Sequence, residues 1–434
     1  MTYTVLTLGC KVNQFETQAM ETLLAQHGFS KAEGEQADVI IVNTCAVTAE
    51  SGRKSRQAVR RLKSEHPDAV LAVCGCYSQT APEDADELGA DIVYGSGDRR
   101  KMVEDVLACV NERAKYRLID DPFKRIEFEN LPAGAMDGRT RAYMKIQDGC
   151  DNFCSYCIIP YARGRVRSMP IAEAVEQAEK LNAEGYEEIV VTGIEISSYG
   201  KDLRDGSNLA DIICAVAKAA PKARIRLGSI EPTVITEEFA SRLAECGNIC
   251  PHFHLSLQSG CDSTLKNMRR KYDTARFYEA ACILRSHFVN CALTADLITG
   301  FPGETDEDHA ATLAFIEKCA FSQMHIFPYS IRPGTKAAAM PNQLQRSIKE
   351  SRAREASRLA NRMQEEYLDS MVGKTVPVLY ETEHNGFWHG HSDNYCEVAA
   401  EGSELHGKTL QTLIVERKDK KLYGKVIDFD NLVR

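Results

Sequence analysis

The sequence predicts an α/β fold in three parts: an N-terminal parallel α/β sheet domain, a central partial (β/α)6 barrel and a small C-terminal antiparallel β-barrel. Short apolar runs alternate with amphipathic stretches of helical length over the first two parts, which indicates parallel strands joined by helices. The last part has short β-type runs separated by Gly and polar turns, which favours a small barrel. With 434 residues and 44% hydrophobic composition, the chain is long enough for two or three domains.

The first domain is expected over residues 1–130. Its strands are predicted at YTVLTL (3–8), DVIIVNT (38–44), AVLAVCG (69–75) and DIVYG (91–95). A cysteine follows the end of each of the first three strands, at Cys10, Cys45 and Cys76. Because ligands bind at the carboxyl ends of the strands in open α/β sheets, these three thiols are expected to meet at one edge of the sheet.

The barrel is assigned to residues 141–370. Six β-type runs, each followed by a segment of helix length, predict its strands: AYMKIQD, EEIVVTG, RIRLGS, HFHLSL, ALTADLI and SQMHIF. Active sites of such barrels gather at the C-terminal ends of the strands, and the stretch DGCDNFCSYC follows the first strand. The segment LPAGAMDGRT, with its Gly and Pro, is predicted to link the two domains.

The third domain is expected over residues 371–434. Before it, LQRSIKESRAREASRLANRMQEEYLDSM has helical periodicity and alternating charge, which is typical of a solvated connecting helix. In FPGETDED, Thr305 is expected to cap a helix and Asp308 to complete a capping box.

The sixteen cysteines could form disulfides or remain reduced, and the N-terminal sequence decides between these. The N-terminus has no basic region, long apolar core or small-residue cleavage site, so a cytoplasmic protein with reduced thiols is expected rather than a secreted one. No apolar run approaches the roughly 20 residues that span a bilayer, so no membrane is expected as a partner. The net charge of −9 argues against a protein that coats nucleic acid without selectivity.

The spacing of Cys150, Cys154 and Cys157 indicates an iron–sulfur cluster. Zinc takes four ligands in a tetrahedron, with cysteine pairs at C-x2-4-C, so three cysteines without a nearby histidine fit zinc poorly. Three thiolates on a four-iron cube leave one iron free to take an exogenous molecule. Three cysteines packed in a core are the alternative, but the residues around them are polar and turn-forming.

This C-x3-C-x2-C motif, with Tyr156 before its third cysteine and a barrel strand before it, resembles the radical S-adenosylmethionine (SAM) superfamily. The resemblance implies a [4Fe–4S] cluster whose open iron chelates the amino and carboxylate groups of SAM. It also implies reductive cleavage of SAM to a 5′-deoxyadenosyl radical, with Cys150, Cys154 and Cys157 as the residues of the catalytic cluster.

Over essentially the whole chain the sequence is similar to the methylthiotransferases of that superfamily. The motifs are LGCKVNQFET, VNTCAVTAE and CGCYSQ in the first domain and SYCIIPYARGRVRS, HLSLQSGCD, MRRKY and DLITGFPGETDED in the barrel. The terminal barrel resembles the RNA-binding TRAM domain. GCKVNQFETQ is most similar to the branch that acts on N6-threonylcarbamoyladenosine in tRNA, next to the anticodon.

This resemblance implies two [4Fe–4S] clusters, the second on Cys10, Cys45 and Cys76, with a sulfur donor on its open iron. One SAM would methylate that sulfur, and another would supply the radical that takes hydrogen from carbon 2 of the adenine. An aromatic C–H bond has no leaving group, which favours radical chemistry. The implied partners are the tRNA anticodon stem-loop, an electron donor such as a flavodoxin or ferredoxin, and a sulfur source.

Not every cysteine is expected to bind iron. Cys74 lies two positions before Cys76, so both would point to the same face of a strand and compete as ligands. Cys76 is favoured because it follows a glycine and lies nearer the end of the strand. The others are interpreted as small buried hydrophobes: Cys109, Cys214, Cys246, Cys250, Cys261, Cys282, Cys291, Cys319 and Cys396.

Residues that bind SAM are also implied by the resemblance. TGIE ends the second barrel strand, where the superfamily has a Gly-Gly-Glu motif for the methionine amino group, and Thr192 replaces the first glycine. A structural turn is the alternative for Glu195, and a buried polar role is the alternative for Ser256, Gln258, Arg270 and Asp296. The full set of expected contacts is Tyr156, Gly193, Glu195, Ser256, Gln258, Arg270 and Asp296.

Two basic segments are candidates for RNA binding. The first, RKSRQAVRRLK, contains Arg53, Lys54 and Arg56, and the second, YARGRVRS, contains Arg163, Arg165 and Arg167. A phosphate backbone across both would bring a base between the predicted clusters. A solvated charged face is the alternative. In the terminal barrel the candidates for base stacking, or for its core, are Phe387, Trp388 and Tyr395.

The leading hypothesis is a tRNA methylthiotransferase acting on N6-threonylcarbamoyladenosine. The alternatives within the family act on isopentenyladenosine in tRNA or on an aspartate of a ribosomal protein, and a protein substrate would leave the basic segments without a purpose. A third class is an iron–sulfur electron carrier or RNA-binding protein without its own chemistry. It predicts four cysteines for each cluster, which the sequence does not offer.

Overall fold

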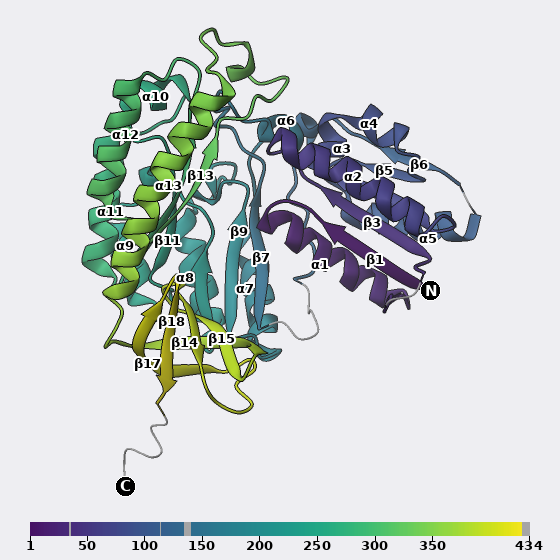
Figure 1. Ribbon diagram of the computed structural model, residues 1–434. Coiled ribbons are helices and arrows are strands. Elements are labelled where there is room, and N and C mark those ends of the chain that lie inside the picture. Colours follow the sequence, from purple (N-terminus) through teal and green to yellow (C-terminus); the bar gives the residue numbers. More distant parts are fainter. Residues whose placement is uncertain (34–35, 113, 134–139, 428–434) are drawn as a thin grey trace.

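The first part of the chain folds into a six-stranded parallel sheet covered by helices (Figure 1). The structure is a computed structural model, and it describes residues 1–33, 36–112, 114–133 and 140–427. The sheet order is β2-β1-β3-β4-β5-β6. The strands are β1 (Thr2–Thr7), β2 (Ser30–Lys31), β3 (Val39–Thr44), β4 (Val70–Gly75), β5 (Ile92–Tyr94) and β6 (Tyr116–Leu118). The helices are α1 (Lys11–Gln26), α2 (Ala49–Glu65), α3 (Cys76–Thr80), α4 (Pro82–Glu87) and α5 (Arg99–Glu112).

The central strand β3 shows why its sequence is continuously apolar. Val39 and Ile41 point into one hydrophobic core, which the helices α1 and α5 cover. Ile40 and Val42 point into a second core on the other face, which α2 covers. A strand buried on both faces has no polar side, as is usual in parallel sheets.

The second part is the predicted partial barrel. Its six parallel strands are β7 (Arg141–Asp148), β9 (Glu188–Gly193), β10 (Arg224–Leu227), β11 (His252–Gln258), β12 (Ala292–Thr299) and β13 (Gln323–Pro328). They form two sheets, which meet where Ile225 pairs with Ile249 and Ile230 with Leu255. A short antiparallel strand, β8 (Arg167–Ser168), adds to the edge beside β7 and was not predicted.

Helices surround this barrel (Figure 1). They are α6 (Ile159–Arg163), α7 (Ile171–Ala183), α8 (Leu209–Ala219), α9 (Glu237–Glu245), α10 (Asp262–Asn267), α11 (Thr274–His287) and α12 (Asp306–Cys319). The capping box predicted for Thr305 and Asp308 is present at the start of α12. Short 3-10 turns are η1 (Pro122–Lys124), η2 (Ile196–Ser198), η3 (Pro232–Val234) and η4 (Ala337–Ala339).

The charge pattern of the connecting helix α13 (Arg346–Asp369) predicted a solvated helix, but one side of α13 is buried. Ala356, Ala360 and Met363 are buried in the core of the partial barrel, because α13 packs along β13. Its charged residues face outwards except at the first turns, where Lys349 and Arg352 are also buried. None of the helices within the described ranges has the length and apolar character needed to cross a membrane.

The third part is a closed five-stranded barrel of order β14-β15-β16-β18-β17. Its strands are β14 (Thr375–His384), β15 (Phe387–Ser392), β16 (Glu397–Ala400), β17 (Thr409–Lys418) and β18 (Lys421–Val426). Four of the pairs are antiparallel, as predicted, but β16 and β18 pair in parallel. The fold class predicted from the sequence is thus confirmed, with this one difference in strand direction.

The terminal barrel docks at the end of the partial barrel where the strands begin. Glu188, the first residue of β9, accepts hydrogen bonds from Arg224 (2.6 Å) and Arg226 (2.9 Å). Arg226 also donates to the carbonyl oxygen of Asp393 in the terminal barrel (2.8 Å). The ring of Tyr395 stacks on His252 of β11 at 4.8 Å between centroids, so this tyrosine serves the interface rather than a base.

The predicted linker LPAGAMDGRT is only partly described. Residues 134–139 lie outside the described residues, and before them Leu131 and Ala133 are buried in the core of the partial barrel.

Gly75 makes the turn from β4 into α3. Its backbone φ is +106°, and a Cβ atom there would lie 2.4 Å from the carbonyl oxygen of Thr44. Gly89 also has a positive φ, of +73°, but a Cβ atom there would meet nothing within 4 Å. Both glycines have a strained backbone conformation for other residues, but only at Gly75 would a Cβ atom also clash. Comparing substitutions at the two positions therefore separates the cost of backbone strain from the cost of the clash.

We expect Gly75→Ala to lower the free energy of unfolding by about 2–5 kcal/mol, because strain and overpacking add. Gly89→Ala should cost only about 1–2 kcal/mol, because it suffers the strain alone. Urea titrations of both variants beside the wild type measure the difference. Equal losses in the two variants would contradict the packing argument for Gly75.

Candidate functional site

The three N-terminal cysteines lie where strands of the first sheet lead into helices. Cys10 directly precedes α1, Cys45 follows β3, and Cys76 is the first residue of α3. The three thiols are close enough to interact electrostatically. Cys45 raises the pKa of Cys10, Cys76 raises that of Cys45, and Cys10 raises that of Cys76. A Cβ atom on Gly9 would lie 2.9 Å from the Sγ of Cys45, so the first two turns are in contact. The structure therefore brings these thiols, the N-terminal triad, together at one edge of the sheet.

Cys74 does not share the side of Cys76, contrary to expectation. It is fully buried in the core that contains Ile41 and Met102, and this burial raises the pKa of its thiol to about 11. The alternation of a strand ends at Gly75, so Cys76 follows the geometry of the turn and the helix instead.

The other three cysteines lie in the loop between β7 and α6 and form the barrel triad. Cys150, Cys154 and Cys157 are all half-buried. Burial raises the pKa of Cys150 above its ordinary value, and the thiols of Cys157 and Cys154 act on it in the same direction. The backbone N–H of Asn152 donates to the Sγ of Cys150 (3.5 Å).

Arg270 ties this loop to the barrel. Its guanidinium donates to the Sγ of Cys154 (3.1 Å), to Glu231 (2.7 Å) and to the hydroxyl of Tyr272 (3.0 Å). Glu231 is buried and also accepts from the side chain of Asn152 (3.1 Å). Glu231 was missed in the sequence, although it stands just after the third predicted strand, where barrel sites gather.

Gly193 and Glu195 lie at the end of β9, beside the same loop. A Cβ atom on Gly193 would lie 2.8 Å from the carbonyl oxygen of Gln147, so only glycine fits without movement. The backbone N–H of Glu195 donates to the side chain of Gln147 (2.8 Å). Burial, and after it the charge of Glu231, raise the pKa of Glu195 to about 7, while Arg270 opposes the shift.

The remaining expected cofactor contacts lie on neighbouring strands. Ser256 and Gln258 are alternate, half-buried residues of β11. Asp296 on β12 is also half-buried, with a carboxylate oxygen 3.5 Å from Nε2 of His254. Tyr156 instead packs its ring edge-to-face on Phe301 (6.4 Å between centroids), in a small hydrophobic cluster.

Arg163 connects the two triads. Its side chain is fully buried, and its Nε donates to the Sγ of Cys76 (3.2 Å). The rest of its guanidinium donates to Asn13 (3.0 Å), to Glu16 of α1 and to Asp148 of β7 (3.4 Å). The charge of Cys76 also acts on Cys157, so the two triads are electrostatic neighbours.

Arg163 belongs to a buried cluster of charges. The carboxylates of Glu16 and Asp148 contact four cations, which are Arg99, Lys145, Arg163 and Arg167. Burial alone would raise the pKa of Glu16, but Arg163, Arg99 and Lys145 together lower it to about 2. Burial raises the pKa of the Cys76 thiol above its ordinary value, and the charge of Arg163 opposes this rise without cancelling it.

The basic segments expected to bind RNA divide into buried and exposed residues. Arg163 and Arg167 are buried, and Arg167 donates to the carbonyl oxygens of Arg163 (3.0 Å) and Arg165 (2.8 Å), so both side chains have partners within the protein. Arg165 itself is exposed.

The other segment lies on the outer side of α2. Arg53 and Lys54 are exposed, and Arg53 forms an ion pair with Glu50. Arg56 lies over the ring of Tyr77, 5.6 Å from its centroid, and 3.4 Å from a carboxylate oxygen of Asp84.

The cysteines interpreted as buried hydrophobes are so in most cases. Cys282 is exposed on α11 and contradicts that interpretation, while Cys214, Cys246 and Cys261 are half-buried. Among the described residues, no three His, Cys, Asp or Glu side chains could hold a single metal ion. Thiolates of a four-iron cube bind different irons, so they need not converge on one point.

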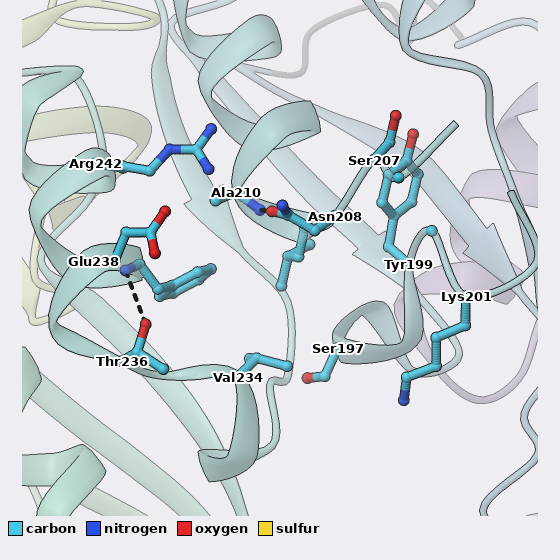
Figure 2. Close-up of a pocket in the computed structure, with 14 residues that line it drawn as sticks. Ser197, Tyr199, Lys201, Ser207, Asn208, Ala210, Val234, Thr236, Glu238 and Arg242 are labelled. Carbon is cyan, nitrogen blue, oxygen red and sulfur yellow. Dashed lines mark hydrogen bonds between the residues drawn. The ribbon is translucent and has the colours of Figure 1, made fainter. Parts of the chain in front are cut away.

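A cavity of about 430 Å³ is lined by residues of η2, by the segment that leads into α8, and by residues of α9 that include Arg242 (Figure 2). Thr236 caps α9 there by accepting from the backbone N–H of Phe239 (3.1 Å). The lining includes no cysteine and none of the residues expected to bind SAM. The candidate site is therefore the region of the two triads.

Comparison with known proteins gives matches over both triads. A family model described as the radical SAM superfamily matches residues 144–316, and one described as uncharacterized protein family UPF0004 matches residues 2–95. The threonylcarbamoyladenosine tRNA methylthiotransferase MtaB of Bacillus subtilis is 39% identical, over 94% of this chain and 93% of that protein. The tRNA-2-methylthio-N(6)-dimethylallyladenosine synthase of Acetivibrio thermocellus is 33% identical, over 87% of this chain and 80% of its own length.

A solved structure shows the same fold at low identity. The radical S-adenosylmethionine methyltransferase TsrM from Kitasatospora setae has a TM-score of 0.58 and 16% identity, over 78% of this chain and 75% of that one.

We expect Arg163→Met to destabilise the protein by about 3–5 kcal/mol, because it leaves buried carboxylates without their main partner. Denaturant titration measures the loss, and limited proteolysis between the first two domains should become faster. Arg165→Met, two residues away and exposed, should change stability by less than about 0.5 kcal/mol. A stable Arg163→Met protein would show that the two domains are held together by other contacts.

Proposed function

The chain belongs to the methylthiotransferase family of radical SAM enzymes, and we propose that it converts N6-threonylcarbamoyladenosine next to the anticodon of tRNA to its 2-methylthio derivative. The observation that carries this proposal is that the two cysteine triads lie close together. Arg163, which follows the barrel triad, donates to Cys76 of the N-terminal triad, and Cys76 affects the pKa of Cys157. The substrate is proposed from the name of the Bacillus subtilis relative, which is 39% identical. SAM and [4Fe–4S] clusters are the cofactors of this family.

The donor sets of both triads fit such clusters. We propose that Cys150, Cys154 and Cys157 hold one cluster and Cys10, Cys45 and Cys76 the other. When bound, the first would supply the electron that cleaves SAM, and the second would hold the sulfur to be transferred. The protein's own contribution is visible in hydrogen bonds from Arg270 and Arg163 to one thiol of each triad.

The residues beside the barrel triad support a role in holding SAM. Glu195, in its ionised form, would bind the amino group of the methionine moiety, and Gly193 allows Gln147 of β7 to pack closely against the end of β9 beside it. The buried pair of Arg270 and Glu231 fixes the position of Cys154 and of the loop around it. Tyr156, Ser256, Gln258 and Asp296 are proposed as further contacts or supports.

For the RNA, basic residues with exposed or half-buried side chains are proposed as phosphate contacts. Arg53, Lys54 and Arg56 lie on α2, which follows the loop of Cys45, and Arg165 follows the barrel triad. A cytoplasmic location, a flavodoxin or ferredoxin as electron donor and a separate sulfur source complete the proposal. Dimethylallyladenosine is the second candidate nucleoside, because the Acetivibrio thermocellus relative bears that name at 33% identity.

The two triads should have separable tasks. The combined change of Cys10, Cys45 and Cys76 to Ala should give a protein that still forms 5′-deoxyadenosine but no methylthio nucleoside. Mass spectrometry of digested tRNA after an anaerobic reaction, with deoxyadenosine counted in the same tube, measures both products.

Cys74→Ala is the matched control and should retain both products, because Cys74 is a core residue. A methylthio nucleoside from the triple variant would refute the role of the N-terminal triad. Modification of an isopentenyl-bearing RNA alone, by the wild-type enzyme, would refute the proposed substrate.

Binding of SAM should strengthen as the pH rises through about 7, where Glu195 loses its proton. The raised pKa keeps this carboxyl neutral below that pH, and only the carboxylate attracts the amino group of SAM. Each pH unit below the pKa should weaken affinity about tenfold. Equilibrium dialysis of SAM with the reconstituted enzyme measures it, and Glu195→Gln should bind weakly at every pH. The same pH profile in this variant would assign the titration to another group.

A further inference from the structure

The segment between β13 and α13 spans the two triads. It leaves β13 at the end of the barrel where α6 lies (Figure 1). The backbone N–H of Ala337 donates to the carbonyl oxygen of Ser155, inside the loop of the barrel triad (2.7 Å). A Cβ atom on Gly334 would lie 3.6 Å from Cδ1 of Ile158, in the same region. The segment is thus fastened to the loop that carries Cys154 and Cys157.

Arg332, in this segment, reaches towards the other triad. Burial lowers the pKa of its guanidinium, and the nearby side chains of Cys45 and Tyr77, both from the first domain, oppose this shift. Its Nε is buried and has no hydrogen-bond partner. Within the described part of the chain its guanidinium forms no hydrogen bond or ion pair, whereas its backbone oxygen accepts from Thr335 (2.8 Å).

Arg163 and Arg270, the two arginines that donate to cysteines of the triads, also have carboxylate partners. Arg163 donates to Glu16, Asn13 and Cys76, and Arg270 donates to Glu231 and Cys154. A buried N–H group without an acceptor is costly, because it has lost water without gaining a partner, and the Nε–H of Arg332 is such a group. Such a group is satisfied when a ligand brings the acceptor.

A guanidinium selects its ligand by shape. Its planar fork of N–H groups matches the two oxygens of a carboxylate or of a phosphate. Arg332 lies between the two triads, where the proposed reaction requires the target nucleoside to be held. An RNA substrate offers both kinds of oxyanion there: the free carboxylate of a threonylcarbamoyl group and the phosphates on either side of the modified nucleoside.

We propose that Arg332 binds an oxyanion of the RNA substrate at the opening between the two triads. This inference rests on the proposed function, because it takes RNA as the ligand. It makes Arg332 a substrate-binding residue, in contrast to Arg163 and Arg270, which position the cysteines.

The test is a binding measurement on the anaerobically reconstituted enzyme. Anticodon stem-loops with either N6-threonylcarbamoyladenosine or plain adenosine at the target position are titrated into wild type, Arg332→Gln and Lys336→Gln. Lys336 is the matched control, because it is an exposed cation of the same segment. We expect Arg332→Gln to raise the Kd for the modified stem-loop roughly tenfold or more, as for a lost hydrogen bond to a charged group. Lys336→Gln should change it little.

The two RNAs identify the oxyanion. A loss confined to the modified stem-loop assigns Arg332 to the carboxylate, and an equal loss with both assigns it to a phosphate. Arg332→Lys should recover only part of the affinity, because a point charge lacks the planar fork. Unchanged affinity of Arg332→Gln for both RNAs, or an equal loss in Lys336→Gln, would overturn the inference.

Two further measurements, the iron content and the methylthio product, distinguish a failure of the role of Arg332 from a failure of the proposed function. Arg332→Gln should retain the iron of the wild type, and lost iron with unchanged RNA affinity would assign Arg332 to the N-terminal triad and overturn the proposal. If wild type modified only an isopentenyl-bearing stem-loop, the proposed substrate would fail. The comparison on plain adenosine would still decide whether Arg332 binds a phosphate.

Discussion

A buried ion pair between Arg163 and Glu16 holds the two halves of the site in one arrangement. Glu16 lies on α1, the helix that begins directly after Cys10, and Arg163 lies on α6, the helix that follows Cys157. Each partner is therefore rigidly connected to a cysteine of its own triad. Because charges without access to water are tolerated only in the geometry that pairs them, a sliding movement between the domains would break the pair. The relative position of the triads is set by charge rather than by apolar packing alone.

The same group of charges also sets the chemistry of the cysteines. Burial by itself raises the pKa of Cys76, and Arg163 counteracts it through charge and a hydrogen bond. Glu16 and Asp148 pair with the cations Arg99, Lys145, Arg163 and Arg167, which lie on both sides of the interface between the two domains. A cluster bound through the thiolate of Cys76 would add negative charge beside Arg163, so its binding and the stability of this interface would support each other.

The elements that the sequence predicts best are those with strong local patterns. The doubly buried β3 and the six barrel strands are long apolar runs, and all are present. The strands β2 and β8 have two residues each, too few for any period to show. For the site, the close spacing of Cys150, Cys154 and Cys157 predicts the barrel triad, and the positions of Cys10, Cys45 and Cys76 at the ends of predicted strands predict the N-terminal triad. The burial of Arg163 could not be read from YARGRVRS, because its partner Glu16 is 147 positions away. Glu231 and Arg332 were missed for the same reason: each belongs to a pattern that exists only after folding.

The terminal barrel stands at one end of the partial barrel and the cysteines at the other. The strand β7 runs between these ends with 8 residues, a length of about 26 Å at the usual rise of a strand. A ligand that touches both ends must be at least that long. A free nucleoside is far too short, whereas a folded stem with a loop can reach from one end to the other. On the proposed function, this separation sets a minimum length that an anticodon stem-loop meets and a free nucleoside does not.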